Sequence, residues 1–197
     1  SFQKISFNVG PTLMRWMDDF AEETYAAITE QERWNYEQFG VGNGMAQSYN
    51  YSILPLANTQ DKITQVRWGI KDFEKRFGHK PAGMWLPETA VDTATLCVLS
   101  DNDIKFTILA PWQVIPENGA EGPYLINLPD GRDPFVVFTY DQELSTRVSF
   151  HPSSTVNGDL FLESILSNRA NNEDGLLLIA SDGELYGHHQ PFRDLFL

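Results

Sequence analysis

The chain of 197 residues is 42% hydrophobic and 13% aromatic, which is enough apolar material for one folded domain with a sizeable core. Its formal net charge of -13 argues against a nucleic acid or an anionic membrane surface as partner, because both need a basic face. An uncharged ligand such as a sugar is compatible with this charge. Cys97 is the single cysteine, which excludes an intramolecular disulfide and favours a reduced, cytoplasmic setting.

Strand-like and helix-like segments alternate along the chain. In chain order, we expect strands at residues 5–9, 49–56, 83–86, 105–109 and 176–180, with helices from residue 11 onward and at 22–38, 61–77, 89–102 and 160–168. Residues 124–128 and 135–140 could form a hairpin across Asp130-Gly131, or residues 135–140 could be a barrel strand. Such alternation is typical of right-handed βαβ units in a parallel sheet, so the sequence predicts a single α/β domain over residues 1–197.

Several local details accompany this prediction. The first helix is expected to bury Leu13, Trp16, Met17 and Phe20, which fall at helical spacing. Asp61 is expected to cap the helix at 61–77. His79 and His151 lie in loop-like contexts and receive no specific role. Both ends of the chain read as cut within ordered segments, so we expect a piece of a longer protein.

Two carboxylates each follow a short apolar run. Glu88 comes directly after Met84-Trp85-Leu86-Pro87, and Asp182 follows Leu176-Leu177-Leu178-Ile179-Ala180-Ser181. In parallel α/β folds, catalytic groups collect at the carboxyl ends of the strands. Two acids delivered there from different strands form the pair that glycoside hydrolysis needs. The structural alternatives are a helix N-terminal acid for Glu88 and an Asx turn with Gly183 for Asp182.

Other polar and aromatic residues near these acids are candidates for binding a sugar. Trp112 follows the strand at 105–109, and an aromatic face there could stack on a sugar ring or pack under its loop. The remaining candidates are Trp85, whose position inside its strand favours a core residue, and Asp141, Glu184, His188 and His189. His188 and His189 are neighbours in sequence and therefore make a poor metal chelate, so no metal site is predicted.

Four segments resemble glycoside hydrolase family 57: residues 6–13, 47–57, 83–90 and 180–189. Within them, Gly83-Met84-Trp85-Leu86-Pro87-Glu88 looks like the family's nucleophile motif, and Ala180-Ser181-Asp182-Gly183-Glu184 looks like its acid/base motif. The likeness is strongest to a branch of large family 57-like proteins. The family's first motif, His-x-His, is absent, and Val41 and Tyr51 stand where that branch commonly has histidines.

The resemblance implies a parallel (β/α)7-type barrel, here incomplete because its first strand is missing. It also implies retaining hydrolysis or transglycosylation of α-linked glucans or related α-glycosides, without a cofactor. Glu88 would be the nucleophile and Asp182 the acid/base, with a carbohydrate as the partner. Two alternatives remain open: a non-catalytic carbohydrate-binding relative, and a metal-dependent polysaccharide deacetylase.

Overall fold

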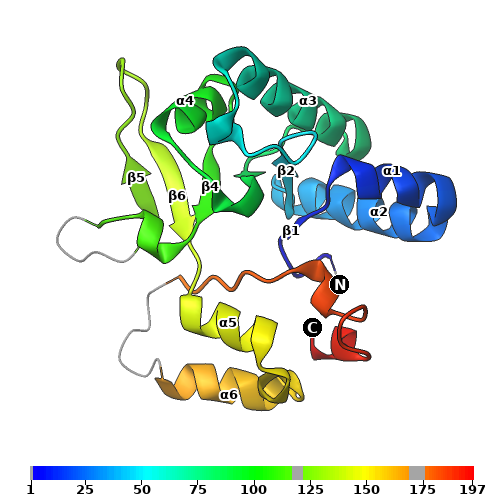
Figure 1. Cartoon of the computed structure of the whole chain (residues 1–197). Coiled ribbons are helices and arrows are strands. Elements are labelled where there is room, and N and C mark those ends of the chain that lie inside the picture. The colour runs from blue at the N-terminus through cyan, green and yellow to red at the C-terminus, as the bar shows by residue number, and fades with distance from the viewer. Residues whose placement is uncertain (1, 117–121, 169–175) are drawn as a thin grey trace. The chain divides into compact units, whose positions relative to one another are not determined.

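The computed structural model describes residues 2–116, 122–168 and 176–197 (Figure 1). The chain divides into two compact units. The first comprises Ser1–Ile108 and Leu125–Val137, and the second comprises Leu109–Tyr124 and Phe138–Leu197. Within the described ranges, no helix combines the length and the apolar character that crossing a membrane requires.

A parallel sheet lies at the centre of the first unit. Its strands are β1 (Phe7–Asn8), β2 (Gly44–Gln47) and β3 (Met84–Trp85), in that spatial order, and both pairs are parallel. A parallel bridge between Gly83 and Phe106 extends the arrangement to β4 (Phe106–Leu109). The predicted α/β class with a parallel sheet is therefore confirmed.

A second sheet has the order β4-β6-β5, with β5 at Tyr124–Ile126 and β6 at Phe135–Thr139. The amide of Val136 donates to the carbonyl of Lys105, and the amide of Tyr140 donates to that of Leu109. These two bonds advance by the same number of residues on both strands, which is the parallel arrangement. β6 therefore neighbours β5, as the hairpin interpretation predicts, and it also joins the sheet beside β4. Its assignment as a strand of a barrel stays a prediction.

The first helix of the chain buries a different face from the predicted one. The helical pair α1 (Pro11–Phe20) and α2 (Glu22–Phe39) forms as expected, with Pro11 in the first turn. However, α1 buries Met14 and Met17, whereas Leu13, Trp16 and Phe20 are exposed. The two rows are adjacent on the helix and share Met17, so periodicity alone could not select between them.

Helix α3 (Thr59–Phe77) covers the sheet and is followed after β3 by α4 (Thr93–Asp101) (Figure 1). The buried face of α3 contains Val66, Phe73 and Phe77. Its cap is Asn58 rather than Asp61: the Asn58 side chain accepts the amide of Asp61. Asn58 comes first in the chain and has the extended backbone that a cap requires.

The prediction of a strand at residues 49–56 is wrong. The strand is β2, four buried residues that end at Gln47, and residues 54–56 form a 3₁₀ turn instead. The chain has left the sheet by Tyr49, because the amide of Tyr49 donates to the Gln65 carbonyl on α3. None of the described residues therefore forms a strand that pairs with the β-forming side chains after residue 49.

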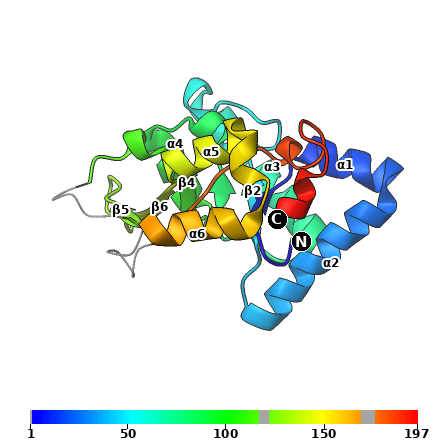
Figure 2. The ribbon, with the colours of Figure 1, turned by 90° about the horizontal axis from the view of Figure 1, so that it is seen from below.

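The second unit contains two helices that lie side by side in both views, α5 (Gln142–Phe150) and α6 (Gly158–Asn168) (Figures 1 and 2). The sequence predicted α6 and missed α5. The sequence of α5 is rich in Ser, Thr and Val, which are weak helix formers, so its composition gave little signal. The helix begins because the Asp141 side chain accepts the amide of Leu144, and it buries Val148.

The prediction of a strand at residues 176–180 is also wrong. The segment carries no ladder pairing, and Leu176 and Ile179 are 58% and 36% exposed, so it is not covered on both faces. It is tied at two points: the amide of Asp141 donates to the Leu178 carbonyl, and the amide of Ala180 donates to the Ser145 hydroxyl. An apolar run becomes a strand only where a neighbour offers repeated backbone bonds, and none of the described residues does so here.

Candidate active site

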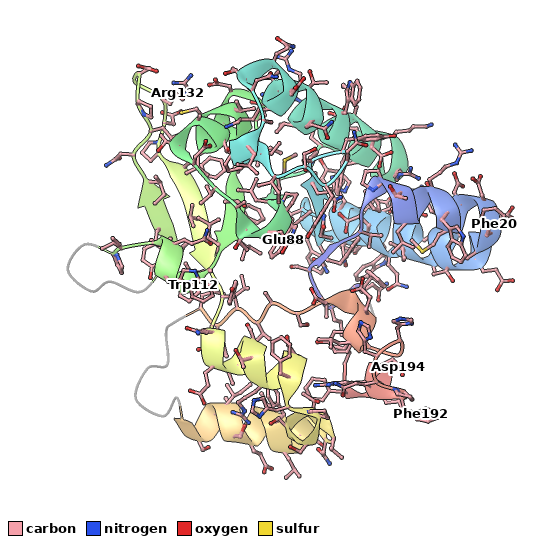
Figure 3. All side chains as sticks on the ribbon, in the orientation of Figure 1. Phe20, Glu88, Trp112, Arg132, Phe192 and Asp194 are labelled. Carbon is pink, nitrogen blue, oxygen red and sulfur yellow. The ribbon has the colours of Figure 1, made fainter. Side chains whose placement is uncertain are left out.

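Glu88 lies where the sequence predicted it, just beyond the carboxyl end of a parallel strand. It sits in a 3₁₀ turn, Pro87–Thr89, that follows β3 (Figure 3). Its side chain is exposed. The strand behind it is firmly held, because Met84 and Leu86 are fully buried. The alternative role as the N-terminal acid of the next helix is not observed, since that helix is capped by Asp92.

The backbone that carries Glu88 is strained. Glu88 and Thr89 both adopt the left-handed conformation, with φ of 56° and 53°. This conformation is unusual for any residue other than glycine and especially for a β-branched one such as Thr89, and it costs about 1–3 kcal/mol per residue. The surrounding structure must stabilise it. The amide of Thr89 donates to the Leu86 carbonyl, and the amide of Ala90 donates to that of Pro87.

Asp92 anchors the chain a few residues beyond Glu88. Its carboxylate accepts the Thr95 amide at 2.6 Å, which caps α4, and it binds the Lys62 ammonium of α3 at 3.1 and 3.2 Å. Burial raises the pKa of Asp92, but the hydrogen bonds from Thr95 and Lys62 outweigh burial and hold the pKa below its ordinary value. The sequence did not predict this pair, because residues 62 and 92 are 30 residues apart in the chain.

Trp85 is half-buried on β3 and stands in register with Gln47 of β2. A side chain at this position both packs in the sheet and retains exposed surface. Either of the two roles considered for Trp85, core residue or part of a binding surface, is compatible with this placement.

Asp182 is exposed and precedes a short 3₁₀ turn, Gly183–Leu185. Its side chain makes no capping bond, so the Asx turn considered as an alternative is not formed. The neighbouring Ser181 hydroxyl lies 2.8 Å from the Tyr186 hydroxyl, which fixes the local path of the chain. Glu88 belongs to the first unit and Asp182 to the second.

Three further candidates follow Asp182 on the same exposed segment. The Glu184 carbonyl accepts the amide of His189 at 2.8 Å, and the rings of His188 and His189 lie edge to face with centroids 4.8 Å apart. All three side chains are exposed. In the part of the chain that the structure describes, no group of three His, Cys, Asp or Glu side chains is placed to hold a metal ion.

Trp112 and Asp141 are close to an open cleft in the second unit. The cleft has a volume of about 970 Å³, and its lining includes Tyr140, Asp141, Arg147 and Leu178. The Trp112 side chain is 65% exposed and stands edge to face against Tyr140, with centroids 6.2 Å apart. Asp141 is occupied as the cap of α5, so its carboxylate has a structural role as well as a place in the cleft.

His79 has a specific environment that the sequence did not predict. Its side chain is 5% exposed, and its Nε2 lies 3.1 Å from Oε1 of the buried Glu32 on α2. Tyr36 stacks on the imidazole ring at 4.0 Å. The adjoining Gly78 ends α3 and brings the chain back to the sheet, so a position that reads as a loop in sequence is part of the core.

Comparison with known proteins identifies the family. The model of glycosyl hydrolase family 57 matches residues 10–197. The chain belongs to glycosyl hydrolase family 57. An α-amylase from Pyrococcus abyssi (strain GE5 / Orsay) is 19% identical over 188 residues, which cover 93% of this chain and 27% of the α-amylase.

Two solved structures share the fold of this chain. The 4-α-glucanotransferase of Thermococcus litoralis has a TM-score of 0.73 at 16% identity, covering 98% of this chain and 29% of that protein. The α-amylase AmyC of Thermotoga maritima has a TM-score of 0.69 at 17% identity, covering 92% of this chain and 49% of AmyC. This chain therefore spans between about a quarter and a half of the length of these relatives.

Proposed function

We propose that the protein to which this chain belongs is a retaining glycoside hydrolase or transglycosylase acting on α-linked glucans. Membership of family 57 supports the class, and the relatives' names, α-amylase and 4-α-glucanotransferase, support the substrate. The observation that carries the proposal is the position of Glu88, exposed on a strained turn at the carboxyl end of a buried parallel strand. We further propose that its catalytic domain is a (β/α)7-type barrel and that the enzyme is cytoplasmic.

The proposed mechanism uses two carboxyl groups and no cofactor. Glu88 attacks the anomeric carbon and forms a covalent glycosyl-enzyme, while Asp182 donates a proton to the departing glycosidic oxygen. Asp182 then removes a proton from water, or from a sugar hydroxyl in transglycosylation, as that oxygen displaces Glu88. A retaining site requires the two carboxyl groups to be about 5–5.5 Å apart in the assembled enzyme.

The proposed binding surface is aromatic and polar. Trp112 offers an exposed ring on which a sugar could stack, and the cleft beside Tyr140 and Asp141 offers hydrogen-bonding groups. We assign Glu184, His188 and His189 to the same surface because they follow Asp182 on one exposed segment. We also assign the half-buried Trp85, which precedes Glu88 by three residues on the same unit, to substrate binding.

Substitution of the nucleophile tests the proposal. We expect Glu88→Gln in the intact protein to reduce turnover of α-glucans by at least about 10³-fold, because the covalent step is lost. Glu37→Gln is the matched control, since Glu37 is an exposed residue of α2 that undergoes the same chemical change away from the site. Circular dichroism and the melting temperature should be the same for both variants. Equal activity of the two variants would contradict the proposal.

Azide rescue tests the retaining mechanism separately. In Glu88→Ala the side chain no longer blocks the face opposite the leaving group, so azide can attack the anomeric carbon as Asp182 protonates an activated leaving group. A single displacement inverts the anomeric centre, so an α-glycoside should give a β-glycosyl azide. Recovery of activity without this product would argue against Glu88 as the nucleophile.

One observation favours a non-catalytic carbohydrate-binding relative as the second candidate. Both Glu88 and Asp182 are exposed, whereas the acid/base of a glycosidase is commonly held in a less polar environment that keeps it protonated. A binding protein would retain its affinity for a glucan after Glu88→Gln and show no turnover before it. Calorimetric titration with a malto-oligosaccharide, run beside the activity assay, separates the two candidates.

A further inference from the structure

The ion pair between the buried Lys62 and Asp92, whose side chain is 40% exposed, connects two helices next to the strained turn of Glu88. Lys62 lies on α3, and Asp92 is the cap of α4. The Lys62 side chain is 5% exposed, and its ammonium lies 3.1 and 3.2 Å from the two carboxylate oxygens of Asp92. A cation with so little access to water depends strongly on its partner, because separating the pair would leave an uncompensated buried charge.

We propose that Lys62, acting through Asp92, is a positioning residue that holds the turn of Glu88 in its strained conformation. The inference rests on the proposed function of Glu88 and adds a residue that does not itself touch the substrate. Its basis is the short connection between Glu88 and Asp92, together with the different ways in which the two ends of that connection are fixed.

The near end of the connection is fixed by the sheet. Leu86 is fully buried, and its carbonyl accepts the amide of Thr89. The buried hydroxyl of Thr107 on β4 donates to the Met84 carbonyl at 2.8 Å, which braces the strand from the side. The chain therefore leaves the sheet at a well-defined point just before Glu88.

The far end of the connection is fixed by Asp92. Only three residues, 89–91, separate Glu88 from Asp92. A displacement of Asp92 would therefore also displace Glu88, because the connection is too short to absorb it. The left-handed conformations of Glu88 and Thr89 persist only when both flanking attachments hold them. The Thr95 amide holds Asp92 to its own helix, whereas Lys62 holds that helix to α3.

The first test compares two substitutions on the same helix. Lys62→Met removes the buried cation and keeps the length of the side chain. Lys71→Met makes the same chemical change at an exposed residue of α3, whose partner is Glu74. We expect Lys62→Met to lower kcat by about tenfold to a hundredfold with KM within about twofold, because misplacing a reacting group slows chemistry more than binding. Lys71→Met should leave both constants unchanged.

The second measurement does not depend on activity. Hydrogen exchange should become faster at the amides of Thr89 and Ala90 in Lys62→Met, because these amides close the strained turn. The amide of Tyr186 donates to the Gly183 carbonyl after a 3₁₀ turn of the second unit and serves as the internal reference. Unchanged exchange at residues 89 and 90 relative to residue 186 would overturn the inference.

A double variant separates positioning from stability. Lys62→Met with Asp92→Asn leaves neither charge unpaired, and Asn can still accept the Thr95 amide as a cap. We expect it to regain the melting temperature lost in the single variant while kcat stays low and exchange at the turn stays fast. If kcat recovers together with stability, the pair has only a structural role and the inference is wrong.

The outcomes also distinguish this inference from the proposed function. If Glu88→Gln retains turnover, the proposed function fails, and exchange at Thr89 and Ala90 still decides whether Lys62 holds the turn. If Glu88→Gln is inactive while Lys62→Met matches Lys71→Met in kcat and in exchange, the proposed function stands and the role of Lys62 is refuted.

Discussion

His79 and Glu32 form a buried ion pair that closes the core of the first unit, with His79 Nε2 and Glu32 Oε1 3.1 Å apart. Nδ1 of the same ring lies 3.0 Å from the carbonyl oxygen of Lys80. Both ring nitrogens thus face acceptors, an arrangement that suits an imidazole protonated on both nitrogens. Glu32 also accepts the amides of Asn43 and Gly44, so the pair fixes the chain that enters β2.

This arrangement predicts that stability depends on pH through His79. Burial lowers the pKa of His79, but the hydrogen bonds to Glu32 and the Lys80 carbonyl, together with the Glu32 charge, outweigh burial and raise the pKa above its ordinary value. The stabilisation is then fully present below the unfolded pKa of about 6.5 and is lost as pH rises through the folded pKa. We expect His79→Gln to reduce the free energy of unfolding by about 1.5–3 kcal/mol at pH 5.5, as for hydrogen bonds to charged groups.

The test of this prediction is how the difference in free energy of unfolding between the wild type and His79→Gln changes with pH. In urea unfolding from pH 5.5 to 9, the free energy of unfolding of the wild type should approach that of His79→Gln as pH rises, because His79 loses its proton. The loss of the stacked Tyr36 contact does not depend on pH and so does not change this trend. His151→Gln is the control, since His151 is exposed. A gap between wild type and His79→Gln that stays constant over this range would show that His79 is neutral in the folded state.

The sequence predicted best the features that depend on local pattern. Helix α3 was found because its apolar residues recur at helical spacing and Gly78 ends it in a left-handed conformation, with φ of 79°. The position of Glu88 could be predicted because a short apolar strand before an acid is itself a local pattern. The Lys62–Asp92 and Glu32–His79 pairs could not, because their partners lie 30 and 47 residues apart and no periodicity relates them.

The errors occurred where the neighbour of a segment decided its structure. Residues 176–180 have the composition of a buried strand but lack the repeated pairing that would make them one. Helix α5 has weak helix-forming composition but is started by its Asp141 cap. The placement of Asp182 after a strand was therefore not confirmed, and its catalytic role stays a prediction that the activity assays must test.

Gly69 provides a prediction about packing between α3 and the sheet. It is a buried glycine in the middle of a helix, where replacement by alanine ordinarily stabilises by about 1 kcal/mol. Here an added Cβ would lie 1.9 Å from the backbone carbonyl oxygen of Gln47, which ends β2. We therefore expect Gly69→Ala to destabilise by about 1–3 kcal/mol through overpacking.

Urea unfolding of two glycine variants checks this sign. Gly183→Ala is the control, because an added Cβ there meets nothing within 4 Å. Its free energy of unfolding should change by less than about 0.5 kcal/mol. A stabilised Gly69→Ala would mean that α3 can move away from β2 at little cost, and that the close approach of helix and strand is not needed for the fold.

Trp112 provides a prediction about the binding of sugars. Its ring is 65% exposed and contacts Tyr140 edge to face, so most of its apolar surface is free to meet a ligand. Trp112→Ala should raise KM for an α-glucan, or the dissociation constant of a malto-oligosaccharide, by about tenfold, the effect of losing one aromatic contact of about 1.4 kcal/mol.

Trp16→Ala is the matched control, because Trp16 is also about half exposed, at 53%, and contacts one ring, that of Phe20. Both variants should lose similar, small amounts of stability, since neither ring is buried. Equal affinity of the two variants would remove Trp112 from the proposed binding surface and leave its ring with a packing role against Tyr140.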